Sequence, residues 1–285
     1  MGWRATLDLE YSRGAEGTTL RFAHDGPMRV FKSLYPEGPA TCHTVWVHPP
    51  GGLVQGDELN VDLRVADHAH ALLSTPGATR FYSNQSGALA QQHVRCEVQD
   101  HARLEWLPLE TIVYPGCLGV STWHANLAPT AEVLAMETTH LGLPGADQAF
   151  TQGRWHQRQA IGSVWLDEGV IDATDHALLN GPAGLAGHRH MGTLLLARGS
   201  AWPDAQREQL LELARSCLSQ HPKVTAGASA VHPQVLLLRA VALQGQHVAP
   251  LLRAVWRLWR QQAWGLPALA PLGHVVCVFF GATAP

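Results

Sequence analysis

VADHAHALL (65–73) is a short stretch in which one alternating segment meets a turn and a second segment follows. Its scheme is apolar, any residue, turn residue, any residue, Ala, any residue, apolar. The scheme returns in VQDHARLEW (98–106) and LAPTAEVLA (127–135), which begin 33 and then 29 residues further on. Each copy is typical of a strand, a tight turn and another strand. Such a recurrence indicates stacked layers, as in a β-helix, in which each layer buries its neighbour. Three similar hairpins in an ordinary sandwich are the alternative.

Period-two alternation continues on both sides of these copies. Half-buried strands alternate in this way, and the clearest examples are ATLDLEYS, ELNVDLRVA, HVRCEVQ and STWHANLA. We therefore predict a mainly β fold with a β-helical, stacked-strand body over residues 1–200.

The C-terminal part, residues 201–285, changes character. Apolar residues recur at helical spacing in 203–220 and 247–263, which predicts two main helices. Between them, two strands are expected about a turn at His232–Pro233. We expect the helices and this closing strand pair to pack on the body, so that the chain is one structural unit.

Composition limits the possible partners. A formal net charge of -3 over 285 residues gives no electrostatic footprint for nucleic acid. No window approaches the roughly 18–20 apolar residues that span a bilayer, so no membrane partner is expected. The five cysteines are odd in number and form no CxxC pair, which favours reduced thiols and a cytoplasmic location.

The glycine-rich stretch HPPGGLVQGDELN (48–60) could be a phosphate loop, a metal loop or a tight turn. A phosphate loop needs a lysine where this stretch has acids, and a dinucleotide fingerprint needs a helix where a strand follows. The turn interpretation fits better, because Gly51, Gly52 and Gly56 allow positive φ and close backbone approach. Asp57 then either caps the turn or faces inward as a functional carboxylate.

Several longer motifs carry a family resemblance. These are LYPEGPATCHTVWVHPPGGLVQGDEL, LLSTPGATRFY, LEWLPLETIVYPG, GRWHQR (153–158), GPAGLAGH (181–188) and MGTLLLA (191–197). In this order they resemble the UreD (UreH) family of urease accessory proteins over roughly residues 3 to 265. The chain departs from the family pattern at Leu109, where glutamine is usual, and at 114–117, where an acid is missing. Its ending, LGHVVCVFFGATAP, also differs, so no family role is carried beyond about residue 266.

The resemblance implies a protein that is not an enzyme. It implies a β-helical body with a small helical part, and binding to apo-urease. It further implies recruitment of the UreF accessory protein and, through UreF, of the GTPase UreG. Together these proteins deliver nickel to urease, and a water-filled passage through the fold is the implied nickel route. Nickel is then in transit, and no cofactor is expected to be tightly bound.

Nickel transfer requires exchangeable oxygen or imidazole ligands. The acids inside the family motifs, Asp57, Glu105 and Glu110, are our candidates for the nickel passage. Alternatively, Glu105 faces solvent and Asp57 only caps the glycine turn.

Seventeen histidines also invite a metal hypothesis. His68 with His70, and His188 with His190, are spaced by two, which on a strand puts both rings on one face. No HExxH motif or Cys/His cluster completes either pair, so surface or packing roles are the alternative.

The last predicted helix carries a candidate partner interface. Trp256, Trp259, Arg253 and Arg257 combine aromatic and guanidinium groups, which suits protein binding; the indoles could equally pack the helix on the body. Two other functions stay open: a β-scaffold interaction module with no metal role, and a β-helix enzyme acting on carbohydrate. For the enzyme, Asp167, Glu168 and Asp172 come closest, but their spacing gives no persuasive acid/base pair.

Overall fold

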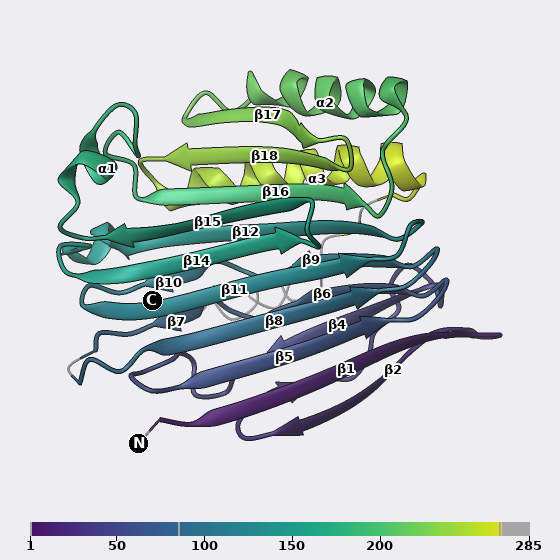
Figure 1. The fold of residues 1–285 in the computed structure, drawn as a ribbon, viewed down its shortest axis with the longest axis horizontal. Helices are drawn as coiled ribbons and strands as arrows, with labels where there is room; N and C mark the ends of the chain where they lie inside the picture. The colour runs from purple at the N-terminus through teal and green to yellow at the C-terminus, as the bar shows by residue number, and fades with distance from the viewer. Residues whose placement is uncertain (1, 85, 268, 270–285) are drawn as a thin grey trace, which may run out of the picture.

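The structure is a computed structural model that describes residues 2–84, 86–267 and 269. Its strands stack one above another in two facing sheets, rising from β1 and β2 to β17 (Figure 1). Within the described residues the first sheet has seven strands in the order β15-β14-β11-β8-β5-β1-β2. Their bounds are β1 Arg4–Gly14, β2 Gly17–Asp25, β5 Glu58–Val65, β8 Ala90–Val98, β11 Cys117–Leu127, β14 Gly153–Ile161 and β15 Trp165–Asp172.

The second sheet has the order β17-β18-β16-β12-β9-β6-β4-β3, with short strands joined to its side. Its main strands are β3 Arg29–Val30, β4 Thr41–Val47, β6 His70–Ser74, β9 Arg103–Leu107, β12 Glu132–Leu143, β16 His190–Arg198, β17 Val224–His232 and β18 Val235–Ala242. The side strands are β7 Thr79–Phe81, β10 Thr111–Val113 and β13 Gln148–Ala149.

The predicted repeat is confirmed in the strand register. Val98 lies opposite Val65 and Leu127 in the parallel first sheet. After the turn, Arg103 lies opposite His70 and Glu132 in the parallel second sheet. Each copy therefore takes the chain from the first sheet to the second at the same position along the strands, one layer after another, which makes the body solenoid-like.

Proline and glycine bend the chain after β6 and after β9, so that short strands form beside the second sheet. Pro76 and Gly77 follow β6, and Pro108 follows β9, so the chain bends before it enters β7 and β10. β12 lacks such a break and continues straight. It pairs with β9 along its first half and with β10 along its second half.

The central strands of the second sheet are buried on both faces, because helices cover the face that the first sheet leaves open. Alternation along β9 shows the division: Leu104 and Trp106 enter the core between the sheets. Leu107 belongs to the core under the helices. Glu105 lies two residues before Leu107 on the same strand, so it also points toward the helices. Each buried leucine contributes roughly 1.5–3 kcal/mol to stability.

The two main helices occur where the sequence predicts them, as α2 (Asp204–Leu218) and α3 (Val248–Trp264). β17 and β18 form the expected strand pair and extend the second sheet through β16. Two 3-10 turns, η1 Pro144–Ala146 and η2 Gly245–His247, complete the elements together with α1 (His176–Asn180). The sequence did not predict α1, which has five residues and begins after the cap Asp175, whose side chain accepts from the Leu178 N–H.

No helix in the described part of the chain is both long and apolar enough to cross a membrane. The atypical ending LGHVVCVFFGATAP lies outside the described residues.

Candidate functional site

Glu105 is the centre of a buried ionic network. Its Oε1 lies 2.8 Å from Nε2 of His70 and accepts from Nε of Arg260 at 3.0 Å. Its Oε2 accepts from Nε1 of Trp256 at 2.8 Å. Burial raises the pKa of Glu105, but the hydrogen bond and charge of His70 and the charge of Arg260 outweigh it, so the pKa is lowered. The alternative that Glu105 faces solvent is wrong: its side chain is fully buried.

Arg260 joins this carboxylate to a second one. Its Nη2 lies 2.6 Å from Oε2 of Glu37, and the other oxygen of Glu37 lies 2.8 Å from Nε2 of His43. Burial raises the pKa of Glu37, yet the hydrogen bonds from His43 and Arg260 lower it further than burial raises it. The network thus connects α3 to β4, β6 and β9. Sequence reasoning missed it, although Arg260 lies four residues after Trp256 and so on the same helix face.

The aromatic part of the candidate interface packs α3 on the sheet. Trp256 and Trp259 are buried, and Nε1 of Trp259 donates to the Leu210 carbonyl of α2 at 2.8 Å. The structure therefore assigns both indoles to packing and not to a partner surface. Arg257 is exposed and Arg253 partly buried, so the two arginines keep the predicted interface role.

Asp57 closes the glycine turn. Its Oδ1 accepts from the Trp3 N–H and its Oδ2 from the Val54 N–H, both at 2.9 Å. The carboxylate thereby ties the N-terminal strand to the turn. This geometry favours the capping alternative for Asp57; its role in a nickel passage stays a prediction.

The three turn glycines act in two ways. Gly51 and Gly56 have φ of 81° and 83°, a conformation that L side chains rarely adopt. Gly52 does not have positive φ, but a Cβ there would lie 2.4 Å from a Tyr82 ring carbon and 2.8 Å from the Arg80 carbonyl oxygen. Close packing is therefore what requires glycine at position 52.

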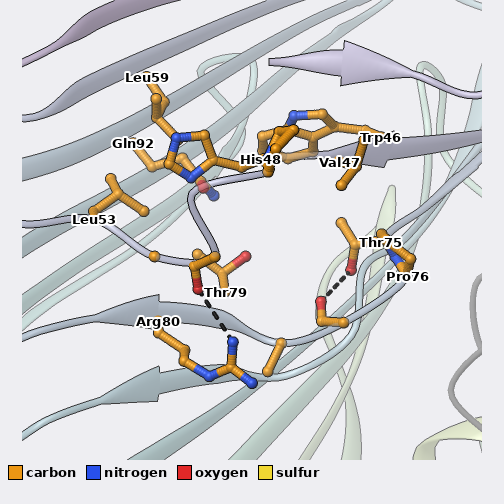
Figure 2. A pocket seen from close by; sticks show the side chains of 15 residues that line it. Trp46, Val47, His48, Leu53, Leu59, Thr75, Pro76, Thr79, Arg80 and Gln92 are labelled. Atoms are coloured by element: carbon orange, nitrogen blue, oxygen red, sulfur yellow. Dashed lines mark hydrogen bonds between the residues drawn. The ribbon is translucent and has the colours of Figure 1, made fainter. Parts of the chain in front are cut away.

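A cavity of about 250 Å³ lies beside this turn (Figure 2). Nδ1 of His48, Nε1 of Trp46 and Oε1 of Gln92 are buried and lack a hydrogen-bond partner among the described residues. All three residues line the cavity. Burial lowers the pKa of His48, partly offset by the charge of Asp57, which favours the neutral imidazole. The cavity thus presents neutral polar groups that need water or another polar partner.

Unpartnered polar atoms continue along the core between the sheets. The Trp46 ring lies 6.0 Å from the ring of Trp106, and Nε1 of Trp106 and of Trp123 also lack partners among the described residues. Trp123 in turn borders a small cavity beside Glu137. These indole N–H groups are unpartnered polar atoms within the core between the sheets, and together with Glu137 we call them the polar line.

Glu137 of β12 bridges the two sheets at the end of that line. Its Oε2 accepts from Nε2 of Gln157 at 2.7 Å and from Nε2 of Gln159 at 2.5 Å, both on β14. Burial raises the pKa of Glu137, and the two amide hydrogen bonds lower it by less. Both glutamines also line a further cavity of about 260 Å³. Sequence reasoning missed Glu137, because the motif used to select acids ends before β12.

Comparisons with known proteins identify the family. A model of the family described as UreD urease accessory protein matches residues 4–273. The urease accessory protein UreD of Variovorax paradoxus (strain S110) is 46% identical over 272 residues, which cover 95% of this chain and 98% of that protein. The proteins of the same name from Albidiferax ferrireducens and Paracidovorax citrulli are 47% and 44% identical over the same shares of both chains.

The chain belongs to the UreD family. The resemblance read from the motifs is thereby confirmed. Leu109, where glutamine is usual in the UreD pattern, donates its backbone N–H to Oγ1 of Thr75 at 2.9 Å. This hydrogen bond does not depend on the side chain at position 109.

In this UreD chain, the two histidines of each predicted pair contact different partners. His68 lies in a turn with φ of 60° and stacks on His101, with ring centroids 4.7 Å apart. His70 opens β6 and binds Glu105 instead. The prediction that His68 and His70 share one strand face is therefore wrong.

The second pair is also separated. Nδ1 of His188 lies 2.8 Å from the Leu185 carbonyl oxygen in the loop before β16. His190 faces His140 of β12, with their Nδ1 atoms 2.5 Å apart. Burial lowers the pKa of both His140 and His190 to about 4.

Glu110 lies on the same side of the molecule. It lines a pocket of about 330 Å³ together with His140 and His190. Within the described residues, no group of three or more His, Cys, Asp or Glu side chains is arranged to hold a metal ion. Any cation bound by the described side chains therefore needs ligands from water or from a partner.

Proposed function

We propose that this chain is a non-catalytic urease maturation factor. It binds apo-urease and recruits UreF and, through UreF, the GTPase UreG. Nickel then passes to urease as cargo along the polar line between the two sheets. Family membership supports the role in maturation. The row of unpartnered polar atoms ending at Glu137 supports the passage.

A passage must bind nickel loosely. Hard and borderline divalent cations accept carboxylate and water oxygens, and exchange requires few protein ligands. Glu137 offers one carboxylate whose partners on β14 are uncharged amides. Its charge is thus not offset by a neighbouring arginine, in contrast to Glu105.

The cavities at both ends of the line suit the entry of a hydrated ion. One lies beside His48 and Gln92, and the other beside Gln157 and Gln159. Each has room for several water molecules, because a water occupies about 30 Å³ of liquid volume. The polar atoms between them supply hydrogen bonds that a hydrophobic core would lack.

The test separates the scaffold role from the passage. Glu137→Gln removes the charge and keeps the size of the side chain, and Glu168→Gln on the exposed face of β15 is the matched control. We expect both variants to co-purify with apo-urease, UreF and UreG. We expect Glu137→Gln alone to lower urease activity reached at limiting nickel.

The outcomes distinguish the alternatives. If Glu137→Gln still supports full urease activation at limiting nickel and the complex is intact, the passage hypothesis is refuted. The alternative of an interaction module with no metal role would then remain. Failure of the unmodified chain to co-purify with apo-urease would refute the scaffold role itself.

A further inference from the structure

His140 and His190 lie opposite each other at the end of the β12–β16 pairing. Their Nδ1 atoms are 2.5 Å apart, closer than the roughly 2.7–3.2 Å of ordinary hydrogen bonds from N–H. The ring planes are tilted by 60°, so the two rings are not stacked. Two neutral nitrogens at this separation repel unless a proton or a cation lies between them.

Gly245 of η2 lies close to these nitrogens. A Cβ at this position would lie 2.5 Å from Nδ1 of His140 and 3.0 Å from Nδ1 of His190. A divalent ion lies about 2.0–2.1 Å from an imidazole nitrogen. Glycine at position 245 therefore keeps a side chain away from both Nδ1 atoms.

The surroundings provide room for water and a negative charge. His140 and His190 open onto the pocket of about 330 Å³ that Glu110 also lines. The pocket has room for water beside the imidazoles, and the Glu110 carboxylate supplies negative charge. Part of that charge acts on Arg253 of α3, which keeps the attraction for a cation moderate.

We propose that Nδ1 of His140 and Nδ1 of His190 bind a divalent first-row transition-metal ion, with water completing its ligands. Imidazole nitrogen suits Ni²⁺, Cu²⁺ and Zn²⁺ and excludes Mg²⁺ and Ca²⁺. Two protein nitrogens give a site from which the ion exchanges readily. This site lies apart from the Glu137 line, and it rests on the proposed function only in the choice of Ni²⁺ as the probe.

A second histidine pair in the same chain provides the control. His68 and His101 have the same centroid separation of 4.7 Å, but their planes are nearly parallel at 14°. Stacked rings direct their lone pairs sideways and cannot chelate one ion. His68→Asn removes one of those rings and keeps a residue that tolerates the positive φ of this turn.

The experiment titrates the purified full chain with Ni²⁺ alone by calorimetry and with Co²⁺ by visible absorption. The variants are His190→Ala, Gly245→Ala and His68→Asn, each checked for folding by circular dichroism. We expect His190→Ala and Gly245→Ala to weaken Ni²⁺ binding by at least about tenfold. Gly245→Ala removes neither imidazole, but its Cβ would lie 2.3 Å from Cε1 and 2.5 Å from Nδ1 of His140, so it crowds the proposed site. His68→Asn should bind as the unmodified chain does.

Two outcomes would overturn the proposal. If the folded His190→Ala variant binds Ni²⁺ as the unmodified chain does, the pair is only a hydrogen bond. If Gly245→Ala keeps full affinity, the ion does not lie in front of the Nδ1 atoms. Because no urease is present, neither result bears on complex formation or on Glu137.

Discussion

Replacing Arg260 with methionine should destabilise the fold more than any other change at the helix–sheet contact. Methionine keeps much of the arginine stem and removes the guanidinium, which leaves Glu105 without its cationic partner. Arg260 and Glu105 are both fully buried, and Arg260 also binds the largely buried Glu37. Breaking a buried ion pair from one side costs about 3–5 kcal/mol, since the remaining charge stays buried and uncompensated. The two lost hydrogen bonds to carboxylates, at roughly 1.5–3 kcal/mol each, give a sum of the same size.

The assay is urea unfolding followed by tryptophan fluorescence, because Trp256 lies within the network. The free energy of unfolding of Arg260→Met at neutral pH should fall by about 3–5 kcal/mol. Arg257→Met on the exposed face of the same helix is the control and should stay within about 0.5 kcal/mol. The double variant Arg260→Met with Glu105→Gln should recover part of the loss, because Glu105 no longer contributes a buried charge without its arginine, although Glu37 still does.

A loss below about 1 kcal/mol for Arg260→Met would refute the reasoning, because exposed ion pairs contribute no more than that. The network would then be open to water. Absence of any recovery in the double variant would show that lost packing, and not a buried charge, causes the effect.

Two further predictions concern the glycine turn and the stability of the fold at low pH. Gly52→Ala should lower the free energy of unfolding by about 1–3 kcal/mol through overpacking against Tyr82. Gly77→Ala, where a Cβ meets nothing within 4 Å, should change it little; equal urea midpoints for the two variants would contradict the packing argument. The pKa of Glu105 and of Glu37 is lowered from 4.5 in the folded chain. Their stabilisation is therefore present above pH 4.5 and is lost as pH falls through the folded-state pKa values. Urea unfolding between pH 6 and pH 3 should show this loss, and Glu105→Gln should show a smaller one; identical slopes would contradict it.

The stacking of the body was predictable because three copies of one pattern impose one register. Val65, Val98 and Leu127 begin the same turn at successive heights, and period-two alternation fixes which side chains enter the core. Both main helices were predicted within two residues of their ends, since apolar spacing and flanking proline or glycine mark those ends. α1 was missed because five residues are too few to show a helical period.

The candidate sites were less predictable, because they depend on contacts between distant segments. Alternation along β9 puts Glu105 on the face opposite Leu104, but sequence does not say that α3 covers that face. The bond from Arg260 to Glu105 spans 155 residues. His140 and His190 are 50 residues apart and meet only through the antiparallel register of β12 and β16. A spacing rule of two residues on one strand could not find them.

The geometry also separates acids that stabilise the fold from acids that are free to bind a cation. Both oxygens of Asp57 accept backbone N–H groups. Both oxygens of Glu105 accept buried side-chain donors. A cation at either carboxylate would have to displace those donors, and at Glu105 it would also have to displace Arg260. The partners of Glu137 are amides and burial raises its pKa, so a hydrated ion that reaches this carboxylate breaks no ion pair and favours the ionised form. A sequence motif does not distinguish between these acids. The donors and charges around each carboxylate decide whether it can bind a cation reversibly.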